Sequence, residues 1–205
     1  MSLSLPRSAL LLAALTLAVA CGEGSGPGGT TSDTLLSMTA LNGIVQNDGT
    51  VSTTATIAAG DVDAAIPGRT TRGFYSFDLS GIPAANVIRT ANLRLVQFAV
   101  SGSPYATLGN VVVDHVTYGA RLDAGDYGGG TVVSGFGVLS SDATTGVRLL
   151  NVFTRVNADR EAGRSVSQFR LRFSLVDGNN DGVTDLAGFN DEDDVPPAML
   201  ILTYE

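Results

Sequence analysis

The chain has 205 residues and a formal net charge of −8 at pH 7, with 20 acidic residues against 12 basic ones. Every basic residue is arginine, and the chain has one histidine, one cysteine and no tryptophan. Nucleic acid is therefore not expected as a partner, because binding to phosphates requires a basic face. A single cysteine excludes a disulfide within the chain, so the fold must be stabilised by its core.

Residues 1–20 have the pattern of a secretory signal peptide. One arginine precedes an apolar run over 9–20, which is shorter than the about 20 apolar residues that a membrane-spanning helix needs. The run ends at Ala18-Val19-Ala20-Cys21, which resembles a bacterial lipobox. We expect cleavage before Cys21 and a lipid anchor on it, although an ordinary signal peptide with a chance cysteine has the same pattern. By resemblance to lipoprotein sorting rules, Gly22 favours the outer membrane or the cell surface.

The residues after the predicted cleavage site divide into a linker and one domain. Residues 21–34 begin with the lipidated cysteine and continue with small and polar residues that have nothing apolar to bury, so they predict a flexible tether. Residues 35–205 are long enough for a single domain with its own core.

Strand signals recur along this domain. They lie over residues 51–57, 73–79, 91–95, 111–116, 166–175 and 199–204. The clearest is 166–175, where Phe169, Leu171, Phe173 and Leu175 alternate with Gln168, Arg170, Arg172 and Ser174. This alternation predicts a half-buried antiparallel strand with its arginines on the exposed side.

One helix interrupts the predicted strands. Val147, Leu150, Phe153 and Val156 recur at every third position, and residues 142–145 offer capping groups before them. Many short strands with glycine-rich turns and one helix predict an all-β fold, an antiparallel β-sandwich of jelly-roll type with one short helix.

Several stretches of the domain resemble a known family. Phe77-Asp78-Leu79-Ser80-Gly81-Ile82-Pro83, followed by residues 87–95, resembles the F-D-L-S-x-(I/L)-P … I-x-x-A-x-L-x-L signature of DNRLRE-type domains. Residues 149–157 resemble their short helix, and 197–204 resemble their closing strand. These domains are bacterial and archaeal surface β-sandwiches related to disaggregatase-associated carbohydrate-binding modules. The resemblance spans most of residues 50–205 and implies a non-catalytic surface module, sometimes attached to enzymes that act on polysaccharides.

The acidic segment from residue 177 to 185 matches most of a calcium-binding loop. The candidate ligands are Asp177, Asn179, Asp181, the carbonyl of Val183, and Asp185, with Gly182 at the turn. Oxygen ligands at this spacing, with glycine at the sixth position, are what a Ca²⁺ loop requires. Position 12 is Gly188 instead of glutamate, so we expect Asp191, or one of residues 192–194, to complete the set. A solvated acidic turn is the other interpretation, because the same residue types dominate ordinary loops.

A second polar and aromatic group lies between the predicted strands. It consists of Asp114, Tyr118, Asp123, Asp126 and Tyr127. Tyrosine rings and carboxylates of this kind can bind a neutral sugar, although the tyrosines can equally fill the corners of a sandwich. The histidine at 115 alternates out of a valine run, which predicts an ordinary surface histidine.

Catalysis is not expected from these residues. A Ser-His-Asp triad would have to use His115, yet the chain has no G-x-S-x-G elbow, and nothing selects a pair of carboxylates for glycoside hydrolysis. The leading hypothesis is a calcium-stabilised, lipid-anchored module that binds glycan or a surface protein. The alternatives are a structural subunit that assembles through edge strands and a hydrolase of an extracellular polymer.

Overall fold

The computed structural model describes residues 29–62, 66, 68–191, 194 and 196–205. The predicted signal peptide, Cys21 and the first part of the tether lie outside these residues. No helix in the described residues is long and apolar enough to cross a membrane.

The described residues form twelve strands and two short helices. The strands are β1 (Thr31–Leu36), β2 (Gly43–Gln46), β3 (Val51–Ser52), β4 (Ile57–Val62), β5 (Thr70–Asp78), β6 (Ile88–Ser101), β7 (Val111–Val116), β8 (Thr131–Ser140), β9 (Gly146–Asn151), β10 (Val166–Phe173), β11 (Thr184–Phe189) and β12 (Met199–Tyr204). The helices are α1 (Pro104–Thr107) and α2 (Phe153–Glu161), and single 3₁₀ turns occur at Thr39–Leu41 and Ala124–Tyr127.

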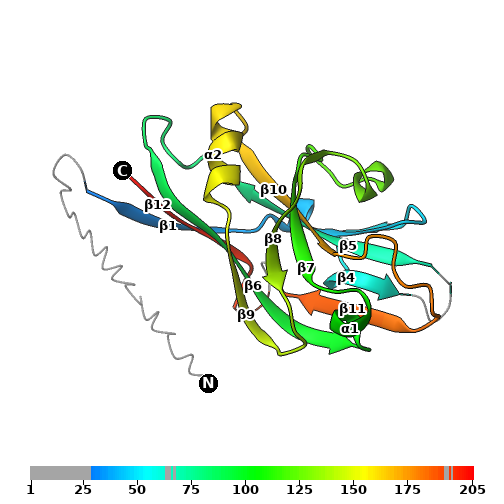
Figure 1. The fold of residues 1–205 in the computed structure, drawn as a ribbon. Coiled ribbons are helices and arrows are strands. Elements are labelled where there is room, and N and C mark those ends of the chain that lie inside the picture. Colours follow the sequence, from blue (N-terminus) through cyan, green and yellow to red (C-terminus); the bar gives the residue numbers. More distant parts are fainter. Residues whose placement is uncertain (1–28, 63–65, 67, 192–193, 195) are drawn as a thin grey trace, which may run out of the picture.

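The strands pair antiparallel in two layers (Figure 1). In the first layer β6 pairs with β12 and β9 and, further along, with β11; β12 also pairs with β1, and β11 with β4. In the second layer β10 lies between β5 and β7, with β2 beyond β5 and β8 beyond β7. A short pairing of β4 with β5 joins the layers. The predicted all-β sandwich with a short helix is confirmed.

The main core lies between the two layers. β6 and β12 contribute Leu93, Leu95, Leu200 and Leu202 from one side, and β5 and β10 contribute aromatic side chains from the other. Phe169 is fully buried, with its ring 6.2 Å from the ring of Phe77 and 6.2 Å from that of Phe136. The odd-numbered side chains of β10 therefore face the core, as their alternation predicts.

The other face of the second layer is also buried, and here the prediction for β10 is wrong. Val45, Phe74, Val116, Tyr118 and Leu122 form a second apolar cluster over this face. Gln168 is 2% exposed and Arg170 is 3% exposed, although both were expected on the solvent side. The cause is the segment between β7 and β8, which folds back over the sheet and removes these side chains from water.

The predicted helix begins later than its sequence pattern suggests. Val147 and Leu150 lie in β9, opposite Val96 and Leu93 of β6, and α2 begins only at Phe153. The apolar residues recur at every third position only by chance, because two of them lie in the strand β9 and two in the helix α2 that follows it. Leu150 is partly buried against the main core, whereas Val147 is 47% exposed.

Two other boundaries also differ from the prediction. The strand predicted over 51–57 is broken after Ser52, because the Ser52 hydroxyl accepts the backbone N–H of Ala55 at 3.1 Å and turns the chain. In addition, β1 begins at Thr31 and pairs with β12 along its whole length, so residues 31–34 belong to the folded domain and not to the tether.

The packing of Phe169 generates the first prediction. Replacing Phe169 by alanine removes a buried aromatic ring from the centre of the core, so we expect the free energy of unfolding to fall by about 3–5 kcal/mol. The matched control is Phe98→Ala, because Phe98 is 47% exposed and should change stability by less than about 0.5 kcal/mol. Urea denaturation measures both, and equal effects of the two changes would contradict this description of the core.

Candidate functional site

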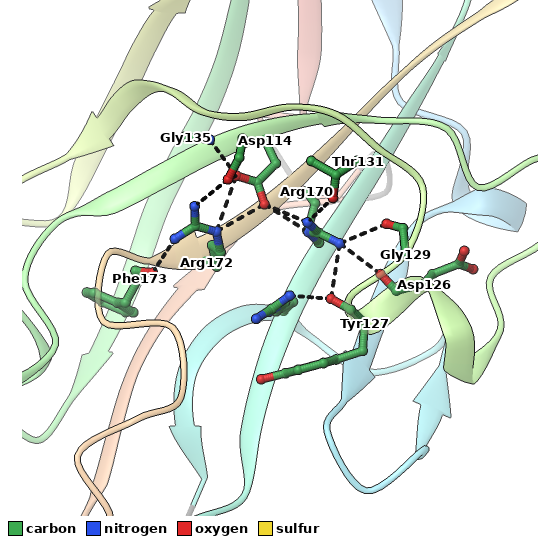
Figure 2. A network of polar contacts seen from close by, with 11 residues as sticks. Asp114, Asp126, Tyr127, Gly129, Thr131, Gly135, Arg170, Arg172 and Phe173 are labelled. Atoms are coloured by element: carbon green, nitrogen blue, oxygen red, sulfur yellow. Dashed lines mark hydrogen bonds and ion pairs between the residues drawn. The ribbon is translucent and has the colours of Figure 1, made fainter.

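A buried carboxylate shared by two arginines organises the outer face of the second layer (Figure 2). Asp114 on β7 lies opposite Arg170 on β10 in the strand register. Its Oδ2 accepts from Nη2 of Arg170 at 2.8 Å and from Nε of Arg172 at 3.0 Å, and its Oδ1 accepts the backbone N–H of Gly135 at 2.6 Å. Asp114 is 0% exposed, so the two guanidinium groups supply the charge compensation that water cannot.

The same arginine fixes the segment that covers this face. Nη1 of Arg170 donates to the backbone carbonyls of Asp126, Tyr127 and Gly129, each at 3.0 Å. The Asp123 backbone N–H donates to Asp126 Oδ2 at 2.7 Å, and Asp123 accepts in turn from Gly125 N, which makes a capping box around the 3₁₀ turn. Arg170 thus fixes the part of this segment that leads into β8, while Gln168 bonds to its beginning at Tyr118 and Gly119.

The five residues predicted as a sugar site do meet here, but their polar groups are engaged within the protein. Asp114, Tyr118 and Asp126 are buried, and the hydroxyl of Tyr118 donates to the carbonyl of Leu41 at 2.9 Å. Tyr127 lies under the guanidinium of Arg72, 3.9 Å from the ring centroid, and only Asp123 is exposed. This arrangement stabilises the fold and leaves little of these side chains accessible to a sugar.

The pKa values of two carboxyls in this cluster are shifted in opposite directions. Burial acts to raise the pKa of Asp114, but the hydrogen bonds from Arg172, Gly135 and Arg170 outweigh it and lower the pKa below its usual value. For Asp126 burial dominates, and its pKa is raised.

The prediction of a surface histidine is wrong, because His115 is 0% exposed. Its Nε2 lies 2.8 Å from Oδ1 of Asp159 on α2, and the same carboxylate accepts from Ser167 Oγ and Arg164 Nη1, each at 2.5 Å. β7 was expected to expose alternate residues, but α2 covers this one. The cluster of His115, Asp159, Arg164 and Ser167 attaches α2 to the sheet.

The attachment of α2 creates an open groove that sequence reasoning missed. Arg160 on α2 donates to the carbonyl of Asn86 at 2.9 Å and to that of Pro83 at 2.8 Å, which fixes the 79–88 turn beside the helix. The groove between them has a volume of about 480 Å³. Its polar lining includes Ser80, Asn86, Asn157, Glu161, Arg164 and Ser165. The turn carries the Leu79-Ser80-Gly81-Ile82-Pro83 motif of the resemblance, which was the signal available in the sequence.

The acidic loop has a different arrangement from the one predicted. Asp177 and Asp181 are exposed, whereas Asp185 is 1% exposed and lies opposite the buried Asp61 of β4. The amide Nδ2 of Asn179 donates to Asp181 Oδ2 at 2.9 Å and to Asp185 Oδ2 at 3.4 Å. Over the described ranges, no three histidine, cysteine, aspartate or glutamate side chains are grouped so that they could hold a metal ion.

Asp191 does not complete this loop. The six residues of β11 separate it from the loop by roughly 20 Å, at about 3.3 Å per residue. It accepts instead from Asn42 Nδ2 at 2.6 Å and from Ser37 Oγ at 3.4 Å, at the other end of the strand. Glu192 and Asp193 lie outside the described residues.

Comparison with known proteins adds no relative: no protein-family model matches the chain, and no curated protein matches it.

The shared carboxylate generates the second prediction. Asp114→Asn leaves the buried guanidinium of Arg170 and the partly buried one of Arg172 without their counter-charge, so the free energy of unfolding at pH 7 should fall by about 3–5 kcal/mol. Because the folded-state pKa of Asp114 lies below its unfolded value, its contribution is present above about pH 4 and is lost as the pH falls through the folded pKa.

Urea denaturation from pH 7 to pH 2 tests both statements. The Asp114→Asn variant should lose less stability in acid than the native protein loses. The control is Asp142→Asn, because the exposed Asp142 side chain contacts Arg148 and the backbone N–H of Thr144, and the asparagine oxygen can still accept from that N–H, so stability should change little. A pH dependence that is identical in native protein and Asp114→Asn would contradict the assignment.

Proposed function

We propose that the protein is a non-catalytic module, anchored in the cell envelope through a lipid on Cys21, that binds carbohydrate in the groove between the 79–88 turn and α2. The observation that carries the proposal is the groove itself. Its volume of about 480 Å³ lies within the roughly 300–1,000 Å³ that is usual for small-molecule sites.

The lining of the groove suits a ligand rich in hydroxyl groups. Leu79, Ile82 and Ile88 are buried and provide an apolar floor. Asn157, Glu161 and Ser165 line the rim, and no hydrogen bond within the described residues engages these three side chains. They offer both donors and acceptors to a sugar.

The geometry around His115 supports a non-catalytic role for the protein. In a catalytic triad the imidazole lies between the serine and the carboxylate. Here the carboxylate of Asp159 lies between His115 and Ser167, and both of these residues are 0% exposed. The chain has no second histidine to replace His115.

A structural subunit is the second candidate, and β1 favours it. In the described part of the chain β1 pairs with β12 alone, which leaves its outer edge open. The strand carries a single charged residue, Asp33. It has no lysine or proline, the residues that commonly prevent an exposed edge strand from pairing with another chain. Concentration-dependent polymers in size-exclusion chromatography would favour this candidate over the first.

Glycan-array binding followed by calorimetry tests the carbohydrate proposal. Asn157→Ala removes one hydrogen-bonding group from the groove, so we expect the affinity for a bound glycan to fall about fivefold, the equivalent of about 1 kcal/mol. The control is Asn92→Ala on β6, which does not line the groove. No binding to any glycan, or equal binding by Asn157→Ala and native protein, would reject the groove as a carbohydrate site.

We propose further that calcium orders the 177–185 loop. Asp61 and Asp185 lie on paired strands, buried and directly opposite one another, and Asp185 also accepts from the backbone N–H of Ser103 and the hydroxyl of Thr107, each at 2.6 Å. A cation would compensate the two carboxylates if the exposed Asp177 and Asp181 moved inward and the Asn179 side chain turned its oxygen toward the ion. Because the loop must rearrange first, we expect binding at the weak end, about 10⁻⁴–10⁻³ M.

Melting curves in EDTA, calcium and magnesium test the calcium proposal. At about 100 times the dissociation constant, calcium should stabilise the protein by about 2.7 kcal/mol. Magnesium should do so poorly, because it requires a tighter octahedron. Asp181→Ala should abolish the calcium effect, and Asp33→Asn on β1 should keep it. Equal melting temperatures in EDTA and calcium would leave a solvated acidic turn.

A further inference from the structure

The outer face of the first layer is largely apolar and exposed. Residues that pair directly across neighbouring antiparallel strands point to the same face of a sheet. Leu149 of β9 lies opposite Arg94 of β6, and Met199 of β12 lies on the other side of Arg94. Leu36 of β1 lies opposite Met199. This row of side chains crosses four strands, and its two ends are well exposed, Leu149 at 61% and Leu36 at 52%.

The neighbouring rows continue this face. Val147 pairs with Val96 on one side, and Val147 is 47% exposed. On the other side Ile201 is partly buried and faces outward, because Leu200 and Leu202 face the core. Further along the layer, residues of β4, β6 and β11 line an apolar depression of about 320 Å³. Its lining includes Ala58, Val62, Ala99, Leu186 and Gly188. A contiguous apolar surface of this kind marks a site of contact.

A cation without a partner lies in the middle of this face. Arg94 is partly buried, and its side chain forms no ion pair or hydrogen bond in the part of the chain that the structure describes. Asp194 lies at the edge of the face, beside Phe98, but the rows around Arg94 contain no acid. Packing against a second copy would bury two such cations without a counter-charge, which is costly. A surface with phosphate groups above apolar chains complements both Arg94 and its neighbours.

The predicted lipid anchor is close to this face along the chain. β1, which carries Leu36, begins at Thr31. The chain between Cys21 and Thr31 can span at most roughly 36 Å, so an anchor on Cys21 keeps β1 within that distance of the lipid surface. Because a short tether makes the second contact intramolecular, a weak affinity of the face suffices to hold the domain on the surface.

We propose that the outer face of the first layer rests on the lipid bilayer in which the protein is anchored. This inference rests on the lipid anchor of the proposed function and adds an orientation of the domain. Leu36, Val147 and Leu149 contact the bilayer at the level where headgroups meet acyl chains, and Arg94 donates to lipid phosphates. The carbohydrate groove shares no lining residue with this face, so the bilayer and a sugar can be bound at once.

The chain has no tryptophan, so one introduced tryptophan reports on one position. The full chain carrying Leu149→Trp is purified with its lipid and reconstituted in vesicles of phosphatidylethanolamine and phosphatidylglycerol, with or without bromine on the acyl chains. Bromine quenches tryptophan on contact, so Leu149→Trp should lose most of its emission in the brominated vesicles. The matched control is Val132→Trp on β8 of the second layer, where Val132 is 44% exposed, and it should keep its emission.

A second substitution tests the face as a whole. Leu36→Asp in the Leu149→Trp protein should restore the emission, because a carboxylate on the face opposes contact with acyl chains. Leu175→Asp, at a side chain 45% exposed between β10 and β11, should leave the quenching unchanged. Equal emission of Leu149→Trp in the two kinds of vesicle would overturn the proposal. Disulfide-linked dimers of a Leu149→Cys protein would then identify a second copy as the occupant of the face.

Flotation of the native protein with the vesicles separates this inference from the anchor on which it rests. A protein that does not float with them contradicts the lipid anchor and, with it, the contact of the face with the bilayer. A protein that floats while Leu149→Trp stays unquenched keeps the anchor and loses only the orientation.

Discussion

The rest of the structure depends on the burial of charge on the outer face of the second layer. The phenylalanine and leucine side chains of β10 point toward the core, and its glutamine and arginine side chains point to the other side of the sheet. In an ordinary sandwich that side would be exposed to solvent. In this protein Asp114 neutralises part of the charge, and Arg170 extends past it to three loop carbonyls. Those bonds hold the segment between β7 and β8 over the face and keep water from it.

The candidate groove depends indirectly on the same layer. β7 carries Asp114 on one face and His115 on the other, so adjacent residues serve opposite sides of the sheet. His115 binds Asp159, and this pair fixes α2 against the core. Arg160, one residue further along the helix, then holds the 79–88 turn through its carbonyls. The groove therefore lies between two elements attached by polar contacts: α2 by the buried pair of His115 and Asp159, and the turn by partly exposed hydrogen bonds from Arg160.

The sequence predicts the inner faces of the strands better than the outer ones. Period-two alternation identified the core-facing residues of β10, and the valine run of β7 matched the strand over Val111–Val116. The alternation of residues in one strand cannot predict that a glycine-rich loop folds over its polar side. Arg170 and Gln168 were therefore predicted to be exposed to solvent. His115 was misplaced for the same reason, because its cover comes from a helix about 40 residues later in the chain.

The candidate site was less predictable than the fold. The residues of the groove come from two segments that are about 80 positions apart, and neither contains a motif that specifies chemistry. The clustering of acids and aromatic residues predicted a sugar site at Asp114, Tyr118 and Asp126. These side chains are buried, however, and they stabilise the fold. The acidic loop matched a calcium pattern by spacing alone. Spacing does not show that Asp61, far earlier in the chain, lies opposite Asp185.

The absence of lysine is consistent with this architecture. A guanidinium presents five N–H donors in a planar fork, whereas an ammonium is a compact, strongly hydrated charge. Arg170 uses its fork to bind a carboxylate, a hydroxyl and three carbonyls at once, and Arg160 bridges a helix and a turn through carbonyls alone. A lysine at either position would retain the charge but lose most of these bonds. Among the described residues, Arg72 and Arg170 are buried together with five aspartates, so these guanidinium groups supply hydrogen bonds and charge compensation inside the protein.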